Sequence, residues 1–439
     1  MEFFDRETEI KRLNEIEVIS RKNAQFTVVT GRRRIGKTQL LLQSTGRQTV
    51  LYFFVSRKAE PFLCQDFQAE MNKNLGVPIL GDVKNFGKLF QFLMQLSKEI
   101  HFTLIIDEFQ EFLNINPSVY SEMQHFWDIN KDGSKINLIV CGSVYSLMHR
   151  IFIDYKAPLF GRATGQMQVR SFKVSVLKEL LNKLEPGNKP DDLLALYAFT
   201  GGVPKYVQLL ADNNSLKVKK MLNFMIREDS PFITDGKNMI IDEFGKDYAI
   251  YFTILSSIAS GNNTRAKIEN CVGKEVSGYL TRLEHDYGLI SRNIPLFAKS
   301  ETKNVRYEID DNFLTFWFRF IYRYSYIIEI AQYDELKRII ERDYTTFSGK
   351  ILERYFRERY MEKGNLTQMG GYWDKTGENE IDLIAVNELD KKAYIAEIKR
   401  NEKHIRYNAL KEKTANMMQK SHCLNDYEIE YLGLSLDDM

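Results

Sequence analysis

The sequence predicts an α/β protein. A parallel β-sheet with flanking helices comes first, followed by a helical segment, a three-helix segment with a β-hairpin, and a second, smaller α/β domain. Three observations predict this order: apolar runs of strand length alternate with helical patterns, a glycine-rich loop joins the first run to a helix, and a hairpin with acidic residues lies near the C-terminus. Buried parallel strands are continuous apolar runs, and their alternation with helices favours an α/β sheet.

Composition excludes several classes of protein. The chain has 439 residues, enough for about three domains. It is 44% hydrophobic and 13% aromatic, which argues against disorder. The net charge of +2 does not by itself indicate a nucleic-acid partner, so any such binding needs a local basic patch. The cysteines form no C-x-x-C pair, which indicates reduced thiols in a cytoplasmic protein. The polar N-terminus is unlike a signal peptide, and no apolar run approaches the ~20 residues of a membrane span.

The first sheet is expected to contain five strands. They are Phe26–Thr30, Val50–Val55, Phe102–Asp107, Ile136–Gly142 and Gln166–Ser171. Ligands of such sheets bind at the carboxyl ends of the strands. Polar or charged residues follow three of these strands, so we expect the functional site at that edge.

The loop Gly31–Thr38 reads Gly-Arg-Arg-Arg-Ile-Gly-Lys-Thr and lies between the first strand and a helical pattern. This context makes G-x-x-x-x-G-K-[ST] a phosphate-binding loop, in which Lys37 reaches the β- and γ-phosphates and Thr38 ligates Mg²⁺. The alternative is a glycine-rich turn beside a basic patch, which does not explain why Lys-Thr begins the helix. The expected nucleotide-binding residues are Gly31, Arg32, Arg33, Arg34, Ile35, Gly36, Lys37, Thr38 and Gln39.

Two acids end the third strand, and a serine follows the fourth. Leu104-Ile-Ile-Asp107-Glu108 is the pattern called Walker B. Asp107 is expected to hold Mg²⁺, and Glu108 to polarise the attacking water as the catalytic base. Ser143 ends the run that begins at Leu138, where it could sense the γ-phosphate. It could equally be the N-cap of the following helix.

Further motifs resemble those of the archaeal-type AAA+/STAND (MNS-like) P-loop ATPases. They are Phe4-Asp-Arg6-Glu7, the phosphate loop, Ile-Ile-Asp-Glu-Phe-Gln110, Cys-Gly-Ser143, Pro158-Leu-Phe-Gly-Arg162 and Thr200-Gly-Gly-Val-Pro204. The resemblance covers the whole chain, including a C-terminal domain of formerly unknown function. It implies that Arg6 and Glu7 lie near the adenine and that Pro204 packs on the nucleotide from a helical lid. It also implies that Arg162 is a charge near the γ-phosphate or a neighbouring site. From the residues alone, the glycines before Pro204 could mark a helix stop and restart, and Arg162 a surface ion pair.

The chain is expected to contain four parts. They are the P-loop ATPase core (1–174), a helical lid (175–238), a winged helix-turn-helix (239–325) and a nuclease-like α/β domain (326–439). The lid has helical periodicity, and lids of this kind close on a ligand. Three helices and two strands, Gly288–Arg292 and Val305–Ile309, predict the winged helix, whose third helix can enter a major groove. Its expected DNA-facing residues are Lys274, Ser277, Tyr279 and Arg282 on the helix and Lys299, Lys303 and Arg306 on the wing. Alternatively, the winged helix is only a packing module. Aromatic residues at helical spacing in 311–324 favour a core or interdomain face.

The segments Asn379–Val386 and Ala393–Lys399 predict a β-hairpin. A turn of residues 387–392 pairs 386 with 393, which makes Asp382 and Glu397 cross-strand neighbours. Like charges directly opposite destabilise a sheet. Mg²⁺ or Mn²⁺ between the two carboxylates would reverse that penalty. A slip of one residue would separate the acids and remove the argument.

The spacing Asp-x14-Glu-x-Lys in this hairpin resembles the PD-(D/E)XK nuclease superfamily, which has a restriction-endonuclease-like fold. The resemblance implies that Asp382 and Glu397 bind metal, that Lys399 orients water or steadies charge, and that Glu353 is the helical acid. The segment Tyr407–Gln419 fits the helix after the hairpin. No proline precedes Asp382, which departs from the pattern. The alternative is a half-exposed hairpin whose acids pair with Lys399 and Arg400.

The sequence therefore predicts a switch ATPase that binds ATP or ADP with Mg²⁺ and controls a C-terminal module that binds DNA and cleaves it with a second Mg²⁺ or Mn²⁺. The expected catalytic residues are Lys37, Glu108, Glu353, Asp382, Glu397 and Lys399, and the expected metal ligands are Thr38, Asp107, Asp382 and Glu397. Expected partners are ATP, DNA and a second copy or another protein, without a membrane. An alternative is a signalling ATPase whose winged helix and C-terminal domain only bind DNA or protein. A helicase-like motor is less favoured, because the chain has one NTPase core and no separate set of helicase motifs.

Overall fold

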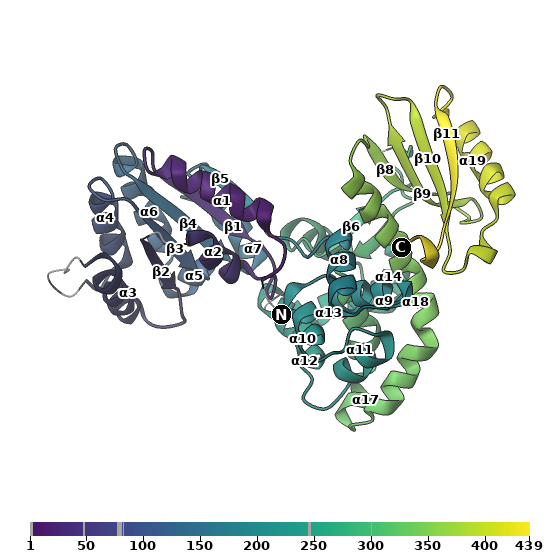
Figure 1. Cartoon of the computed structure of the whole chain (residues 1–439), viewed down its shortest axis with the longest axis horizontal. Helices are drawn as coiled ribbons and strands as arrows, with labels where there is room; N and C mark the ends of the chain where they lie inside the picture. Colours follow the sequence, from purple (N-terminus) through teal and green to yellow (C-terminus); the bar gives the residue numbers. More distant parts are fainter. Residues whose placement is uncertain (1–2, 47–48, 77–80, 82, 245–246, 300) are drawn as a thin grey trace. The chain divides into compact units, whose positions relative to one another are not determined.

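The computed structural model describes residues 3–46, 49–76, 81, 83–244, 247–299 and 301–439. They divide into two compact units, Glu2–Arg170 and Ser171–Met439. In Figure 1 the first unit runs from purple to blue and the second from teal to yellow.

The first unit is built on a parallel sheet in the order β2-β3-β4-β1-β5. Its strands are β1 (Gln25–Thr30), β2 (Val50–Phe54), β3 (Phe102–Asp107), β4 (Ile136–Gly142) and β5 (Gly165–Gln168). The predicted five-stranded parallel sheet is confirmed. The last strand is shorter than predicted because its partner β1 ends at Thr30, so nothing remains for residues beyond Val169 to pair with.

Helices cover both faces of this sheet (Figure 1). They are α1 (Glu7–Ser20), α2 (Lys37–Thr45), α3 (Glu60–Leu75), α4 (Phe86–Leu96), α5 (Phe112–Ile115), α6 (Ser118–Asn130) and α7 (Tyr145–Phe152). Alternate residues of the buried strands enter different cores, because successive side chains point to opposite faces. Val28 and Leu104 pack with residues of α3, α4 and α6, whereas Val29 and Ile105 pack with residues of α1 and α2.

The second unit begins with helices. They are α8 (Val174–Leu184), α9 (Pro190–Thr200), α10 (Pro204–Asp212), α11 (Val218–Met225) and α12 (Pro231–Phe244). Next come α13 (Tyr248–Ala259), α14 (Arg265–Val272) and α15 (Ser277–Thr281), which continues as a π-helical turn over Arg282–Asp286. Two antiparallel strands follow, β6 (Ile290–Asn293) and β7 (Arg306–Ile309).

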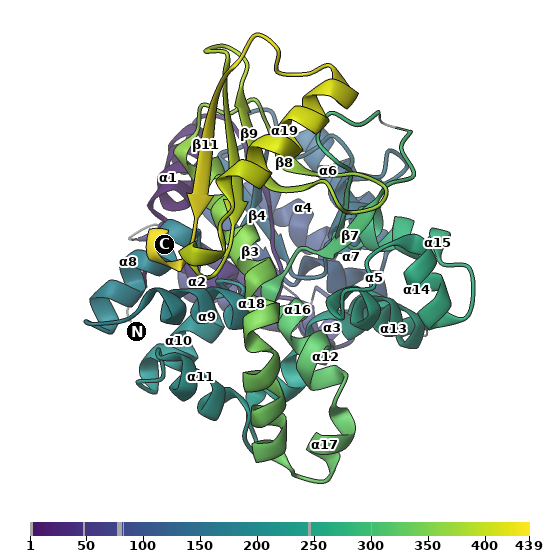
Figure 2. The ribbon, with the colours of Figure 1, turned by 90° about the vertical axis from the view of Figure 1, so that its right-hand side faces the viewer.

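The C-terminal part joins a long helix to a mixed sheet. After α16 (Asn312–Phe316), a π-helical turn (Trp317–Tyr322) and α17 (Ser325–Glu329) comes α18 (Tyr333–Lys363). The strands β8 (Gln368–Trp373), β9 (Glu380–Asn387), β10 (Lys392–Ile398) and β11 (Glu428–Leu434) form a sheet in the order β11-β10-β9-β8. Figure 2 shows α19 (Tyr407–Ser421) lying across this sheet. The aromatic residues Phe313, Phe316 and Trp317 are buried, as predicted for a core face.

Within the part of the chain that is described, no helix combines the length and apolarity needed to cross a membrane.

Candidate nucleotide site and C-terminal carboxylate cluster

The phosphate loop leaves β1 at the carboxyl edge of the sheet and enters α2 at Lys37. Gly31 passes so close to β5 that a Cβ there would lie 2.6 Å from the carbonyl oxygen of Val169. Gly36 has a left-handed backbone, with φ of 86°. These two positions therefore need glycine, one for close approach and one for conformation.

Lys37 is buried, and its Nζ donates to the carbonyl oxygens of Gly31 at 2.7 Å and Arg32 at 3.0 Å. Burial lowers the pKa of the Lys37 ammonium, while the nearby Glu108 and Asp107 act in the opposite direction. The ammonium is thus held inside the curve of the loop, where a phosphate could exchange for the two carbonyls.

Thr38 lies beside the acid at the end of β3, as a shared metal site requires. Its Oγ1 donates to Oδ2 of Asp107 at 2.6 Å. The Tyr52 hydroxyl donates to the same oxygen at 2.8 Å, and burial followed by the Asp107 charge raises the pKa of Tyr52. The hydroxyl and carboxylate oxygens are hard ligands, so they fit Mg²⁺. Sequence reasoning missed Tyr52, although a hydroxyl in the otherwise apolar strand next to β3 was a signal.

Glu108 has a left-handed backbone, with φ of 54°, and its side chain turns toward β4. The Ser143 hydroxyl donates to Oε2 of Glu108 at 2.8 Å and lies 3.1 Å from Oε1. Gln110 Nε2 also donates to Oε2, at 2.5 Å. The N-cap interpretation of Ser143 is wrong, because α7 is capped at Val144 and the serine hydroxyl is used on Glu108.

Arg6 and Glu7 lie at the start of α1 in the first unit. Arg6 is buried, with a φ of 87°, and donates to the carbonyl oxygen of Arg170 at 2.6 Å and to Glu9 at 3.0 Å. Glu7 is exposed. In the second unit, Pro204 begins α10 after the helix break at Gly201 and Gly202, as the stop-and-restart interpretation predicts.

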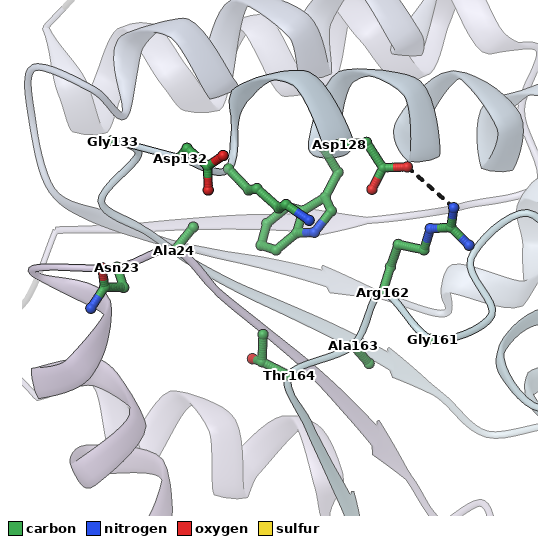
Figure 3. Close-up of a pocket in the computed structure, with 11 residues that line it drawn as sticks. Asn23, Ala24, Asp128, Asp132, Gly133, Gly161, Arg162, Ala163 and Thr164 are labelled. Atoms are coloured by element: carbon green, nitrogen blue, oxygen red, sulfur yellow. Dashed lines mark hydrogen bonds and ion pairs between the residues drawn. The ribbon is translucent and has the colours of Figure 1, made fainter.

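Arg162 lies at the amino-terminal edge of the first sheet. It lines a cavity of about 700 Å³ together with Trp127, Asp128 and Thr164. Its guanidinium pairs with Asp128 at 3.2 Å, as Figure 3 shows. The strand β1 separates this edge from Lys37, which follows the carboxyl end. Arg162 is therefore not near the phosphate loop of its own chain, and the interpretation as a surface ion pair is confirmed. A role at a neighbouring site stays a prediction.

The hairpin register predicted for the C-terminal domain is confirmed. Asn387 faces Lys392, Val386 faces Ala393, and the ladder continues to Leu383 and Ala396. Only residues 388–391 form the turn, so each strand reaches one residue further into the turn than predicted and stops one residue short of its predicted bound at the other end. Asp382 and Glu397 occupy the next position along this register.

Asp382, Glu397 and Lys399 lie together at the end of the hairpin that is opposite the turn. Lys399 Nζ lies 2.9 Å from Oδ2 of Asp382 and 3.7 Å from Oε1 of Glu397. The Ile398 N–H donates to Asp382 at 2.8 Å, and the Arg406 N–H donates to Glu397 at 2.7 Å. Both carboxylates are mostly buried, and their charges raise the pKa of Lys399 against its own burial.

Glu353 on α18 joins this cluster. Burial raises its pKa to about 7, and the charge of Asp382 adds to the rise, while Lys350 at 3.2 Å and Arg357 at 3.8 Å oppose it. We call Glu353, Asp382, Glu397 and Lys399 the carboxylate cluster. Among the described residues, no group of at least three His, Cys, Asp or Glu residues is arranged to hold a metal ion.

The wing residue Arg306 is partly buried and makes contacts within the protein. Its guanidinium pairs with Glu380 at 2.6 Å and stacks on the ring of Trp373, whose Nε1 donates to Asn304 at 3.1 Å. The expectation that Arg306 faces DNA is therefore wrong, since an ion pair and an aromatic face hold it against β8 and β9. Lys299 and Lys303 are exposed, as are Lys274 and Arg282.

Comparison with known proteins gives four findings. A model of an ATPase domain found predominantly in Archaea matches residues 3–210, and a model of archaeal and bacterial proteins of unknown function matches residues 317–417. The uncharacterized protein MJECL04 of Methanocaldococcus jannaschii is 31% identical over 440 residues, which cover 98% of this chain and 94% of that protein. The solved structure of the Walker-type ATPase PABY2304 of Pyrococcus abyssi has a TM-score of 0.54 at 19% identity and covers 72% of this chain and 96% of its own. That likeness concerns the fold.

Proposed function

The chain belongs to the same family as MJECL04 and carries an archaeal-type ATPase domain, and we propose that this domain is a switch controlling a DNA-cleaving site in the C-terminal part. The observation that carries the proposal is the carboxylate cluster, which brings an acid of α18 to two acids and a lysine of the hairpin.

In the ATPase domain, Lys37 would exchange its bonds to the loop carbonyls for bonds to the β- and γ-phosphates. Thr38 and Asp107 would hold Mg²⁺, which neutralises phosphate charge when bound. Glu108 would accept a proton from the attacking water, and Ser143 would turn its single hydroxyl proton from Glu108 to the γ-phosphate when ATP is bound. Arg6 and Glu7 would border the adenine, Pro204 would pack on the nucleotide from the lid, and Arg162 would serve a neighbouring site of a homo-oligomer.

In the C-terminal part, Asp382 and Glu397 would hold Mg²⁺ or Mn²⁺ through hard carboxylate oxygens, which suits these ions. Lys399 would then leave the carboxylates and steady the negative charge that develops on the phosphodiester. Glu353 would complete the acid set from α18. This arrangement supports a nuclease-like α/β fold for residues 326–439.

DNA is the proposed substrate because exposed basic side chains follow Lys399 along the chain. Lys403, His404 and Arg406 are exposed, and their side chains have no partner within the described ranges. They follow Lys399 by four to seven residues, and the Arg406 N–H donates to Glu397 at 2.7 Å, so phosphates held by this segment would lie near that carboxylate. For the winged helix, Lys274, Arg282, Lys299 and Lys303 remain candidates for DNA contact.

A second candidate function is binding without cleavage. It is favoured by the ion pairs from Lys399 to both acids, and by the absence, in the described part of the chain, of acids arranged for a metal ion. In this case the chain is a regulatory ATPase whose C-terminal domain binds DNA or protein.

Nicking of supercoiled plasmid with Mg²⁺ or Mn²⁺ separates these functions. Wild type is expected to nick, whereas Lys399→Ala and Asp382→Asn are expected to lose nicking while still retarding DNA in a gel. Lys392→Ala, which removes an exposed lysine of the same hairpin, is the matched control and should nick normally. No nicking by wild type in any nucleotide state, or equal nicking by Lys399→Ala, would leave only binding.

A further inference from the structure

We propose that Gln110 is a positioning residue for ATP hydrolysis, which fixes the carboxylate of Glu108 so that one of its oxygens faces the attacking water. The inference rests on the proposed role of Glu108 as the base. It assigns Gln110 a role that the motif pattern leaves open.

The contacts of Glu108 divide its two oxygens into different classes. Oε2 accepts from Gln110 Nε2 at 2.5 Å and from Ser143 Oγ at 2.8 Å. Among the residues that the structure describes, Oε1 has only the longer contact with Ser143, at 3.1 Å. Oε2 is therefore the anchored oxygen, and Oε1 keeps lone-pair capacity for a water molecule.

The residues next to Glu108 in the sequence support the same orientation of its carboxylate. Glu108 is held at a φ of 54°, which is costly for a residue with a side chain. Its N–H donates to Oδ1 of Asp107 at 2.9 Å. Gln110 follows in the 3-10 turn Phe109–Glu111 and is fully buried, so its amide is enclosed by the protein two residues from Glu108.

A hydrophobic side chain would fill the place of Gln110 at lower cost. Its Oε1 is buried and accepts no hydrogen bond from the described residues. A buried acceptor without a hydrogen bond destabilises the folded chain. Turning the amide over would be worse, because its oxygen would then face the Glu108 carboxylate. The bond to Glu108 is the interaction in the structure that offsets this cost.

Gly142 makes room for the amide. A Cβ at Gly142 would lie 2.6 Å from Oε1 of Gln110 and would also collide with Met148. The Cys-Gly-Ser segment thus has two linked tasks, since Gly142 admits Gln110 and Ser143 binds the carboxylate that Gln110 anchors. Positioned groups can contribute a hundredfold or more to rate, so loosening one anchor should be visible in turnover.

Steady-state hydrolysis and ATP binding by Gln110→Leu test this role. Turnover (kcat) should fall at least tenfold, while the Kd for ATP stays within twofold of wild type, because Gln110 acts on the base and not on the nucleotide. Gln110→Asn keeps an amide on a shorter side chain, so its turnover should lie between those of wild type and Gln110→Leu. It provides a second variant if Gln110→Leu folds poorly. Asn137→Leu removes a buried amide near the start of β4, and its turnover should match wild type.

The double variant Glu108→Gln with Gln110→Leu gives the decisive comparison. If Gln110 works through Glu108, the double variant should hydrolyse ATP no more slowly than Glu108→Gln alone. Unchanged or faster turnover in Gln110→Leu, with Glu108→Gln inactive, would overturn the positioning role and leave the base intact. Full turnover in Glu108→Gln would instead show that Glu108 is not the catalytic base.

Discussion

At the scale of single residues, Gly31 shows how closely the phosphate loop is fitted to its sheet. A methyl group at this position would lie 2.6 Å from the carbonyl oxygen of Val169, which belongs to the backbone and cannot rotate away. Gly31→Ala should therefore push the loop off β5, lower the free energy of unfolding by about 1–3 kcal/mol and weaken ATP binding. Chemical unfolding and nucleotide titration measure the two effects.

Gly165→Ala is the matched control in β5, since the nearest atom to a Cβ there is 3.7 Å away. It should leave both stability and ATP affinity close to wild type. Equal losses in the two variants would mean that the sheet, and not the loop, responds to the added methyl group.

Glu353 gives the C-terminal domain a predictable pH dependence. Its pKa of about 7 lies above its ordinary value of 4.5, so the folded chain binds this proton more tightly than the unfolded chain does. Stability is then lost as the pH rises through this window, by about 3 kcal/mol at most. Glu353→Gln should remove that loss, so its advantage over wild type in unfolding by urea with EDTA should grow between pH 4.5 and pH 8.

Glu388→Gln changes an exposed acid of the hairpin turn and provides the control. Its difference from wild type should not depend on pH over the same range. A constant difference for Glu353→Gln would show that this carboxyl titrates normally in the folded chain.

At the scale of elements, patterns in the sequence predict those parts whose partners are near in the chain or uniformly apolar. The central strands β3 and β4 have the predicted bounds, and the hairpin of β9 and β10 has the predicted register. The edge strands β8 and β11 were not predicted. Gly370 and Gly371 interrupt the apolar alternation of β8, and β11 alternates acids with apolar residues that are only partly buried.

The wing, where it packs against β8 and β9, is a second case that the local sequence pattern did not predict. In the sequence, Arg306 and Lys303 look alike as basic residues of the wing, yet Arg306 is held by Glu380 and Trp373. These partners lie far along the chain, so no local pattern could distinguish the two residues. Arg306→Ala should lower the free energy of unfolding by about 1–2 kcal/mol and shift the fluorescence of tryptophan.

Lys303→Ala changes an exposed lysine of the same wing and is the control for Arg306→Ala. It should leave stability unchanged and, if the wing contacts DNA, weaken binding and flatten its salt dependence. Stability loss in Lys303→Ala, or none in Arg306→Ala, would contradict the assignment of Arg306 to the interior.

Helices of the expected lid are tied to the C-terminal domain within the second unit. Arg400, next to Lys399, donates to Asp191 of α9 at 2.8 Å and to the buried Ser348 of α18 at 2.6 Å. The Glu362 carboxylate accepts from the Val174 N–H at the start of α8, at 2.9 Å. These contacts offer a path by which movement of α8 and α9 could reach the carboxylate cluster.

At the scale of the whole molecule, the sequence located both candidate sites but could not supply their surroundings. Lys37, Thr38, Asp107 and Glu108 follow from motifs, because each motif lies on one continuous segment. Tyr52 reaches Asp107 only when β2 pairs with β3, and Gln110 reaches Glu108 across the tight turn that follows β3. Arg162 lies at the opposite edge of the sheet from Lys37.

Control of DNA cleavage by the bound nucleotide is the central claim. Plasmid nicking in the presence of ATP and Mn²⁺ by Glu108→Gln, which should retain ATP, and by Lys37→Ala, which should not bind it, tests the claim most directly. We predict nicking rates that differ at least fivefold, a difference that disappears when Lys399→Ala is added to each variant because nicking itself is lost. Equal nicking rates in the two variants would contradict the account.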